Sequence, residues 1–353
     1  MLTRQVAARV YDYEKCIGGN FQWASDFVLG PGGTLYVCQR GFEFFITHGL
    51  VKGTLDEEPI WENRGPLFMG GKSRFPSSID LDKNENIYMS DDYSDRIFIF
   101  DKDGTPLHSW GTEDQSKGEV NGLPGFGIDL YKKKLMGGAS GDGELNGPSG
   151  LVLDPDDNLY VVDSHNHRVQ KFTKDGRFLL KFGSYGTGQG ELAFPWGICL
   201  DQESNVYVAD WRNDRVQKFS PEGKYMASFG LGSGIGPGEL NRPSGVAVDH
   251  DGDIYVVDWL NERLNIYASD TSFVTSFSGD ATELSHHARK RVDVNPDYVK
   301  ARQRADLSKE VFFRGPVAVN VDDEGHIYIL ETVAPRIQIY VKHRDFVDAQ
   351  FNL

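Results

Sequence analysis

One sequence pattern recurs six times along this 353-residue chain, and this repetition limits the folds open to it more than any other feature. Each copy carries a tyrosine inside a short apolar run. The six tyrosines are Tyr36, Tyr88, Tyr160, Tyr207, Tyr255 and Tyr328. They are separated by 52, 72, 47, 48 and 73 residues, so a basic period near 47 is lengthened twice. We therefore expect six similar units and two long insertions, at residues 112–146 and 279–313.

Each copy predicts four short β-strands. In the copy that begins at Pro148, apolar and polar residues alternate over four to six positions, and turn sequences such as Asp154–Asn158 separate these runs. A four-stranded unit that repeats about every 40–50 residues is typical of a β-propeller blade, because a twisted sheet buries both faces only when neighbouring units pack against it. The sequence predicts an all-β, six-bladed β-propeller that forms one domain over residues 1–353.

The sequence leaves open which end of the chain closes the ring of blades. Residues 6–16 near the start and residues 345–351 near the end both have the composition of a strand. Either segment would serve as the outer strand of the last blade.

Two copies agree almost position for position, at Pro148–Gly183 and Pro195–Gly230. They read P-x-G-φ-x-φ-D, then φ-Y-V-x-D-x-x-N-x-R-φ-Q-x-F, then D-G-x-φ and F-G, where φ is apolar. This pattern resembles the NHL-repeat family. The copy from Phe75 has Ser94 at the usual asparagine position, and the first and last copies are degenerate. The resemblance implies a six-bladed β-propeller, which agrees with the count from the period.

The composition excludes several classes of protein. The 37 Lys and Arg residues against 52 Asp and Glu give a net charge of −15, and nucleic-acid binding depends on basic residues that neutralise phosphates. The start of the chain lacks the apolar core of a signal peptide, and no apolar run approaches the roughly 18 residues of a membrane helix. Three cysteines without a CxxC motif suit a reducing compartment. We expect a cytoplasmic protein that binds neither nucleic acid nor membranes.

Three copies share an Asp, an Asn and an Arg in the spacing D-x-x-N-x-R. These residues are Asp163, Asn166, Arg168, Asp210, Asn213, Arg215, Asp258, Asn261 and Arg263. We interpret them as structural, because a residue type that recurs in every blade serves the blade and an Asp–Arg pair closes a turn through charge-assisted hydrogen bonds. Functional residues are expected where one copy breaks the pattern. The face that carries these loops also carries both insertions, which favours it as the functional face.

The second insertion is basic and partly helical. Residues 281–313 hold seven Lys and Arg against five Asp and Glu. Asn295 followed by Pro296 predicts a helix start, and a shorter helix is expected around His286 and His287. The insertion is interpreted either as a solvated helix pair docked on the acidic propeller or as a cationic lid that attracts an anionic small molecule.

Pattern-breaking residues on the loop face are candidates for substrate binding. Trp196, Trp211 and Trp259 fall in adjacent blades and suggest an apolar wall for a ligand or a protein partner, while packing of the insertions against their rings is the alternative. The other substrate-binding candidates are Arg212, Ser77, Ser244, His286 and His287.

The first copy has Arg40-Gly41 in place of the D-x-x-N-x-R loop. An Arg-Gly at this place in a degenerate early blade resembles the peptidyl-hydroxyglycine amidating lyases, and the resemblance implies a substrate-binding and catalytic arginine at the channel mouth. The zinc histidines of those lyases have no match here. Their places hold Ser77, Ser149, Trp196, Ser244 and Val317. Asp26, at a glycine position of the first channel strand, is instead a candidate ligand for calcium or another divalent cation.

Two functional hypotheses follow. The first is a small-molecule enzyme, a lyase or hydrolase, with its pocket at the channel mouth under the inserted lids. Arg40 would stabilise negative charge, and His165 or Tyr93 would move a proton. The alternative is a non-catalytic propeller that uses the same face to bind a protein partner.

Overall fold

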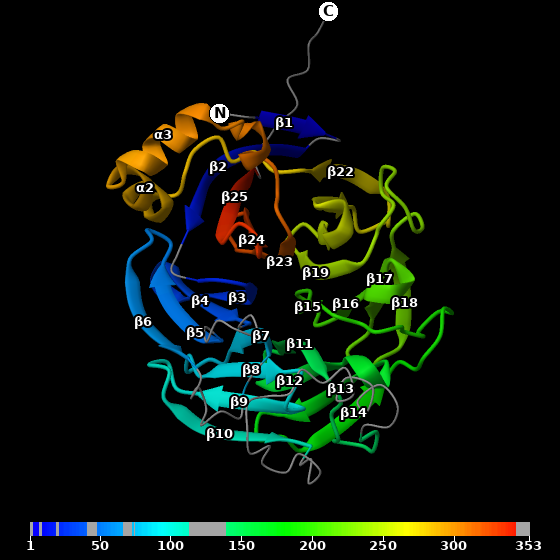
Figure 1. Ribbon diagram of the computed structural model, residues 1–353. Coiled ribbons are helices and arrows are strands. Elements are labelled where there is room, and N and C mark those ends of the chain that lie inside the picture. The colour runs from blue at the N-terminus through cyan, green and yellow to red at the C-terminus, as the bar shows by residue number, and fades with distance from the viewer. Residues whose placement is uncertain are drawn as a thin grey trace, which may run out of the picture.

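The structure is a ring of six β-sheets around a central axis (Figure 1). The computed structural model describes residues 3–6, 9–18, 21–40, 48–65, 73, 75–112 and 139–343. Within these ranges all neighbouring strands of a sheet run antiparallel. The prediction of a six-bladed β-propeller is confirmed.

The blades follow one another in chain order, each with its first strand innermost. Blade 1 comprises β3 (Ala24–Gly30), β4 (Thr34–Gln39), β5 (Gly49–Thr54) and β6 (Pro59–Arg64); blade 2 comprises β7 (Pro76–Leu81), β8 (Ile87–Asp91), β9 (Arg96–Phe100) and β10 (Pro106–Gly111). Blade 3 comprises β11 (Pro148–Leu153), β12 (Asn158–Asp163), β13 (Arg168–Thr173) and β14 (Phe178–Phe182); blade 4 comprises β15 (Ile198–Leu200), β16 (Val206–Asp210), β17 (Arg215–Phe219) and β18 (Tyr225–Phe229). Blade 5 comprises β19 (Pro243–Val248), β20 (Ile254–Asp258), β21 (Arg263–Tyr267) and β22 (Phe273–Phe277).

Blade 6 has five strands and joins the two ends of the chain. It contains β23 (Pro316–Val321), β24 (His326–Glu331), β25 (Arg336–His343), β2 (Arg9–Gly18) and the outermost β1 (Thr3–Val6). Val10 lies opposite His343, and Ile17 opposite Ile337, so the N-terminal strand closes the ring. Residues 345–351, the other candidate, lie outside the described residues.

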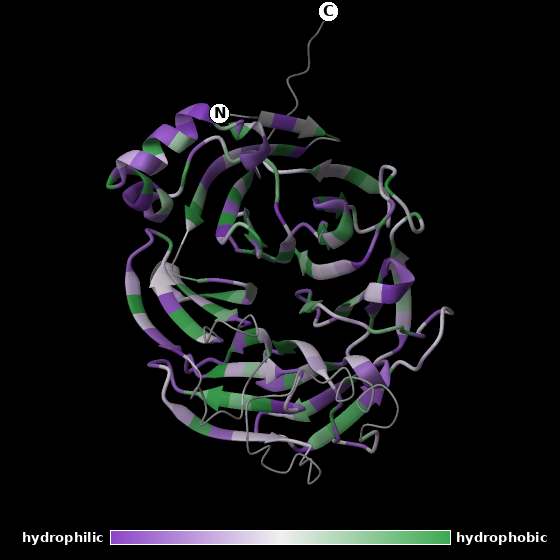
Figure 2. Cartoon of the chain, in the orientation of Figure 1, coloured by the Kyte–Doolittle hydropathy of each residue, from purple (hydrophilic) through white to green (hydrophobic). Residues whose placement is uncertain are grey.

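The alternation of apolar residues fills the spaces between blades. On β12, Leu159 and Val161 pack into the interface with blade 2, while Tyr160 and Val162 pack into the interface with blade 4. Tyr160 is fully buried, and its hydroxyl donates to the Pro221 carbonyl of blade 4 at 3.0 Å. The repeated tyrosine therefore joins one blade to the next. Figure 2 shows the hydrophobic residues concentrated in the strands.

The D-x-x-N-x-R residues hold the links between blades. In blade 4, the Arg215 Nε donates to Asp210 Oδ2 at 2.8 Å, and the same guanidinium donates to the carbonyls of Thr187 (2.9 Å), Gly188 (2.7 Å) and Glu191 (2.8 Å) in the link from blade 3. Two further arginines make the equivalent contacts in blades 3 and 5: Arg168 and Arg263. These geometries agree with the structural interpretation of the motif.

The second insertion forms α2 (His286–Asp293), α3 (Pro296–Arg304) and a 3₁₀ turn (Leu307–Glu310). The Asn295 side chain accepts from the Asp297 amide at 3.0 Å, as the sequence predicts for a helix start. The helices lie at the rim beside β2, and the Glu57 carboxylate of blade 1 accepts from the backbone amides of His286 and His287 (Figure 1). The prediction that this insertion covers the channel mouth is wrong. No helix among the described residues is long and apolar enough to cross a membrane.

Candidate functional site

The loops between the second and third strands lie beside the links that lead into each blade. The amides of His165, Arg212 and Leu260, one in each of three successive loops, donate to the carbonyls of Asn146, Ala193 and Asn241 in the adjoining links. We call this side of the propeller the loop face. The candidate residues that break the repeat in these loops are therefore displayed together with the links.

Arg40 reaches across the mouth of the channel from blade 1. Its Nη2 donates to Ser77 Oγ at 2.7 Å and to Asp92 Oδ2 at 3.3 Å, and its Nε donates to the Pro76 carbonyl at 3.2 Å. The guanidinium carbon stands 5.0 Å from the ring centre of Trp196, which belongs to blade 4 on the opposite side of the ring. Arg40 is thus fixed in position while 28% of its side chain stays exposed.

The segment Phe194–Trp196 gathers the other polar candidates. The ring centre of Phe194 lies 5.8 Å from that of His165 and 4.6 Å from that of His167, and the guanidinium carbon of Arg212 lies 4.5 Å from it. We define the channel-mouth cluster as Arg40, His165, His167, Phe194, Trp196 and Arg212. Two of the predicted catalytic residues therefore contact the segment Phe194–Trp196: Arg40 lies against the Trp196 ring and His165 against the Phe194 ring.

The two histidines of the cluster make different hydrogen-bond contacts. His167 Nδ1 accepts a hydrogen bond from the Phe194 amide at 3.1 Å, and burial together with the nearby Arg212 lowers the pKa of His167, so this imidazole is neutral with its proton on Nε2. His165 Nδ1 lies 3.4 Å from Asn146 Oδ1. In the tautomer that donates a hydrogen bond from Nδ1 to this oxygen, Nε2 carries the basic lone pair.

Sequence reasoning missed Phe194, His167 and Asp92. A signal existed for Phe194, because three copies have glycine or arginine immediately before the proline of the first strand, whereas two have phenylalanine. His167 has a left-handed backbone (φ 56°) at the end of its loop, where the equivalent residues of blades 4 and 5 are acidic. The contact between Asp92 and Arg40 spans two blades and leaves no local trace in the sequence.

Tyr93, the third predicted catalytic residue, packs against Phe75, with ring centres 5.7 Å apart. Its neighbour in sequence, Asp92, contacts Arg40. Tyr93 therefore lies beside the cluster. Its contact with Phe75, which precedes the first strand of the same blade, is equivalent to the contact of Arg212 with Phe194 in blade 4.

The serine candidates connect blades. Ser244 Oγ donates to the Val317 carbonyl of blade 6 at 2.9 Å, and Ser149 Oγ donates to the Trp196 carbonyl of blade 4 at the same distance. Ser77 is 3% exposed and accepts from Arg40. These hydroxyls are occupied by the scaffold, and Ser77 contributes to the site by holding Arg40.

The structure does not bring the three predicted tryptophans together. The rings of Trp211 and Trp259 lie 6.4 Å apart, and the guanidinium of Arg242 stands 4.7 Å from Trp211. Within the described residues, no ring contact joins Trp196 to either of them. Trp259 and its neighbour Leu260 are 38% and 52% exposed. The loop face thus carries an aromatic patch, formed by Trp211, Arg242, Trp259 and Leu260, beside the channel-mouth cluster.

The channel itself is narrow. A cavity of about 50 Å³ lies between the inner strands, and it is lined by Asp26, Ser78 and Trp196 among others. Asp26 accepts from Ser78 Oγ at 2.5 Å and from the amides of Phe27 and Ile79. Burial raises the pKa of Asp26 to about 7. Asp26 belongs to no group of three His, Cys, Asp or Glu side chains in the described part of the chain, so calcium binding there stays a prediction that relies on carbonyl ligands.

The larger cavity lies elsewhere. A pocket of about 380 Å³ lies between α2, α3 and blade 6, and none of its lining residues lines the channel cavity. His287 lines this rim pocket, and His286 is exposed at the start of α2. Neither histidine belongs to the channel-mouth cluster, because the helices that carry them dock on blades 6 and 1.

Comparison with known proteins bears on the repeats. The sequence profile of the NHL repeat matches residues 145–172, 192–219 and 240–267, which lie in blades 3, 4 and 5. The chain carries NHL repeats. It is 40% identical over 45 residues to protein brain tumor of Drosophila melanogaster and 49% identical over 45 residues to RING finger protein nhl-1 of Caenorhabditis elegans. Each match covers 13% of this chain and only 4% or 5% of the relative.

The fold of this NHL-repeat chain is similar to solved propellers over nearly its whole length. A streptogramin B lyase superimposes with a TM-score of 0.56 at 10% identity, over 94% of this chain and 98% of the other. Virginiamycin B lyase from Staphylococcus aureus gives 0.54 at 10% identity, over 94% and 99%. A Bacteroides thetaiotaomicron protein of unknown function gives 0.60 at 17% identity, over 97% and 77%. At these identities the similarity shows the fold alone.

Proposed function

We propose that this protein is an enzyme that acts on a small molecule by a lyase or hydrolase reaction at the channel-mouth cluster. The observation that carries the proposal is the placement of Arg40 over Trp196, with His165 and His167 against the ring of Phe194, two residues earlier in the chain. A fixed cation, two imidazoles and two aromatic rings supply charge stabilisation, proton transfer and an apolar surface on one face.

The chemistry follows from the contacts of each group. Arg40 is held by Ser77, Asp92 and the Pro76 carbonyl, so its guanidinium needs no reorganisation to face negative charge that develops on a substrate oxygen. In a lyase reaction, His165 Nε2 would take a proton from carbon, and the adjacent carbon–oxygen bond would break with its electron pair on the oxygen near Arg40. In a hydrolase reaction, the same nitrogen would take the proton of a water that attacks an ester carbonyl carbon. The bond from that carbon to the alcohol oxygen would then break, and the imidazolium would return the proton to this oxygen.

The comparisons add support of a general kind. Two of the propellers that share this fold are named as lyases. A third solved structure is of the Staphylococcus aureus enzyme together with quinupristin. In it one histidine is replaced by alanine, and this variant is described as catalytically inactive. A histidine is thus required on at least one propeller of this shape. We extend that requirement to His165 because of its place in the cluster.

Mass spectrometry tests the proposal. The protein is incubated with quinupristin and with a panel of small esters and lactones. Elimination within a ring leaves the mass unchanged and moves the retention time, whereas hydrolysis adds the mass of one water. Loss of the stabilising cation or of the base is expected to lower turnover by roughly 100-fold or more in Arg40→Ala and His165→Ala. Lys181→Ala, an exposed cation on β14, is the control. Unchanged turnover in Arg40→Ala would refute the assignment.

The second candidate function is a non-catalytic propeller that binds a protein partner. The aromatic patch of Trp211, Arg242, Trp259 and Leu260 favours it, because exposed aromatic and arginine side chains are typical of binding hot spots. A relative that shares the repeat is named a RING finger protein. Absence of turnover across the panel, together with loss of a captured partner in Trp259→Ala but not in Arg40→Ala, would favour this function over the enzyme.

We also place the protein in the cytoplasm. Its three cysteines, Cys16, Cys38 and Cys199, are free thiols, as a reducing compartment favours. Fractionation of source cells tests this placement.

A further inference from the structure

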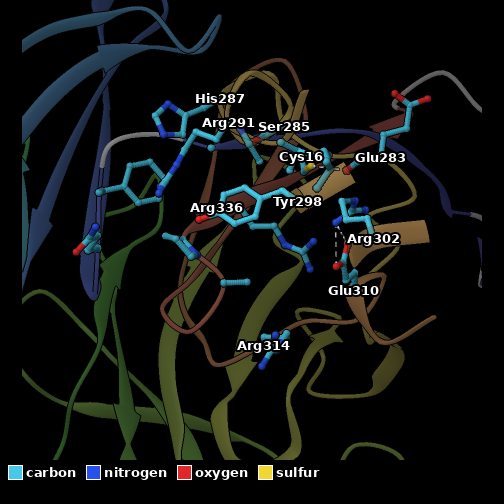
Figure 3. Close-up of a pocket in the computed structure, with 18 residues that line it drawn as sticks. Cys16, Glu283, Ser285, His287, Arg291, Tyr298, Arg302, Glu310, Arg314 and Arg336 are labelled. Carbon is cyan, nitrogen blue, oxygen red and sulfur yellow. Dashed lines mark hydrogen bonds and ion pairs between the residues drawn. The ribbon is translucent and has the colours of Figure 1, made fainter. Parts of the chain in front are cut away.

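The charged groups that line the rim pocket are mostly basic. Its volume of about 380 Å³ falls in the range of small-molecule sites. Figure 3 shows it between the second insertion and blade 6. The basic side chains that line it are His287, Arg291, Arg302, Arg314 and Arg336. It is separate from the channel-mouth cluster in both location and residues.

The pocket lies where blade 6 lacks the kind of link that leads into blades 3, 4 and 5. In blades 3, 4 and 5 the motif arginine donates to three link carbonyls, which lie 24, 27 and 28 residues before it. Arg336 is the equivalent residue in blade 6. Arg336 keeps only the contact with the carbonyl 24 residues before it: its Nη2 donates to the Phe312 carbonyl at 2.8 Å. The helical insertion replaces the rest of the link and leaves a cavity there.

Arg336 consequently has unused donors that are held in place. Its Nε donates to Glu331 Oε1 at 2.7 Å, and Nη2 also reaches Glu331 Oε2 at 3.2 Å. In the described part of the chain, Nη1 has no hydrogen-bond partner, whereas the Nη1 groups of Arg168, Arg215 and Arg263 donate to carbonyls. A ligand oxygen would occupy the place of the missing carbonyls.

The charges around the cavity are not balanced by the protein. Arg302 pairs with Glu310 at 2.8 Å, as the dashed lines in Figure 3 show, and Glu283 pairs with Arg289 on the outside of α2. Arg291 and Arg314 have no ion pair with any described residue. Both acidic side chains of the lining are thus neutralised, and the excess charge is positive.

Most of the remaining lining is apolar, with Gln22 and Ser285 as polar exceptions. Phe21 is buried at one wall, and Leu284 and Val292 come from the insertion. The Tyr298 ring is drawn between the labelled arginines in Figure 3. A ligand that fits this lining carries an acidic group on an apolar body. We propose that the rim pocket binds a small organic anion, a carboxylate or a phosphate monoester, whose acidic group contacts the unused donors of Arg336 and is attracted by the positive charges of Arg291 and Arg314.

Calorimetry with phenyl phosphate, benzoate and inorganic phosphate tests this proposal. The wild-type protein is expected to bind phenyl phosphate or benzoate more tightly than inorganic phosphate, and the tighter of the two identifies the acidic group. The double variant Arg291→Ala/Arg314→Ala removes exposed side chains that form no ion pair within the described ranges, and it is expected to weaken binding about 10-fold or more. Lys290→Ala/Lys300→Ala removes the same charge from α2 and α3 outside the lining and is expected to bind as the wild type does.

Several results would overturn the proposal. The proposal is wrong if neither organic probe binds, or if the two double variants lose the same amount of binding. It is also wrong if inorganic phosphate and phenyl phosphate bind with equal affinity. A crystal soaked with phenyl phosphate supplies the second measurement, and electron density at Arg336 is expected. Arg40→Ala should bind the probe normally, and the arginine double variant should retain any turnover at the channel mouth, so this proposal and the proposed enzyme function fail separately.

Discussion

Substitution of Arg263 by alanine tests whether the repeated D-x-x-N-x-R residues hold the links between blades. Arg263 donates to Asp258 Oδ2 at 2.7 Å and to the carbonyls of Ile235, Gly236 and Glu239 at 2.9, 2.9 and 2.6 Å. The substitution removes all four hydrogen bonds. It also leaves the Asp258 carboxylate, which is 0% exposed, without its cation.

The expected loss in the free energy of unfolding is about 3–5 kcal/mol, because a buried charge that loses its partner keeps its desolvation cost. For a 353-residue chain this corresponds to a fall in Tm of about 4–7 °C. Urea unfolding and calorimetry measure the two quantities. Arg177→Ala removes an exposed arginine in a turn of blade 3 and is expected to change stability by less than about 0.5 kcal/mol.

The pH dependence of Arg263→Ala sharpens the test. Burial raises the pKa of Asp258, and Arg263 opposes that rise. Without Arg263 the pKa rises further, so the carboxyl takes up a proton as the pH falls and the buried charge disappears. The destabilisation should therefore be smaller at pH 5 than at pH 7.5. A loss below about 1 kcal/mol, or a loss equal at both pH values, would refute the view that this ion pair holds the link.

Two further predictions concern the channel and the closure of the ring. The pKa of Asp26 is raised to about 7, so ionisation of this buried carboxyl lowers the free energy of unfolding. The stability of the wild-type protein, measured by urea unfolding, should therefore fall as the pH rises from about 4 to about 8. Asp26→Asn keeps a hydrogen-bond acceptor but cannot ionise, so its stability should lack this fall. Arg9→Gln breaks the ion pair between Arg9 on β2 and Asp253 (2.5 Å), but Lys342 remains 2.8 Å from the same carboxylate. We therefore expect the free energy of unfolding to fall by only about 1–2 kcal/mol in the same assay. An unchanged free energy of unfolding would contradict closure of the ring by the N-terminal strand.

The fold could be predicted because its determinants are local and repeated. One copy of the pattern contains each of these determinants: Tyr160 within its strand, the alternation of Leu159 and Val161, and the turn at Asp154–Asn158. The other copies repeat them. The start of α3 was predictable for the same reason, since Asn295 caps a helix whose first residue is the adjacent proline.

The candidate site was less predictable because its contacts join distant parts of the chain. Arg40 contacts Trp196 from the opposite side of the ring of blades, and the sequence around either residue gives no sign of this contact. The docking of α2 depends on Glu57, which lies 229 residues before His286. The sequence showed that the second insertion is basic and helical, but its position over blade 6 is set by these long-range contacts.

The two candidate sites arise from one physical cause, the loss of a repeated contact. In blade 1 the loop has Arg40 and no motif aspartate, so the guanidinium turns to Ser77 and Asp92 in the next blade and to the Trp196 ring. In blade 6 the motif arginine is present, but the link carbonyls are replaced by helices, so Arg336 has unused donors beside a cavity. A regular blade, such as blade 4 or blade 5, engages all three nitrogens of its motif arginine in hydrogen bonds. Functional capacity in this propeller is therefore expected where the repeat leaves an arginine incompletely satisfied by its own blade.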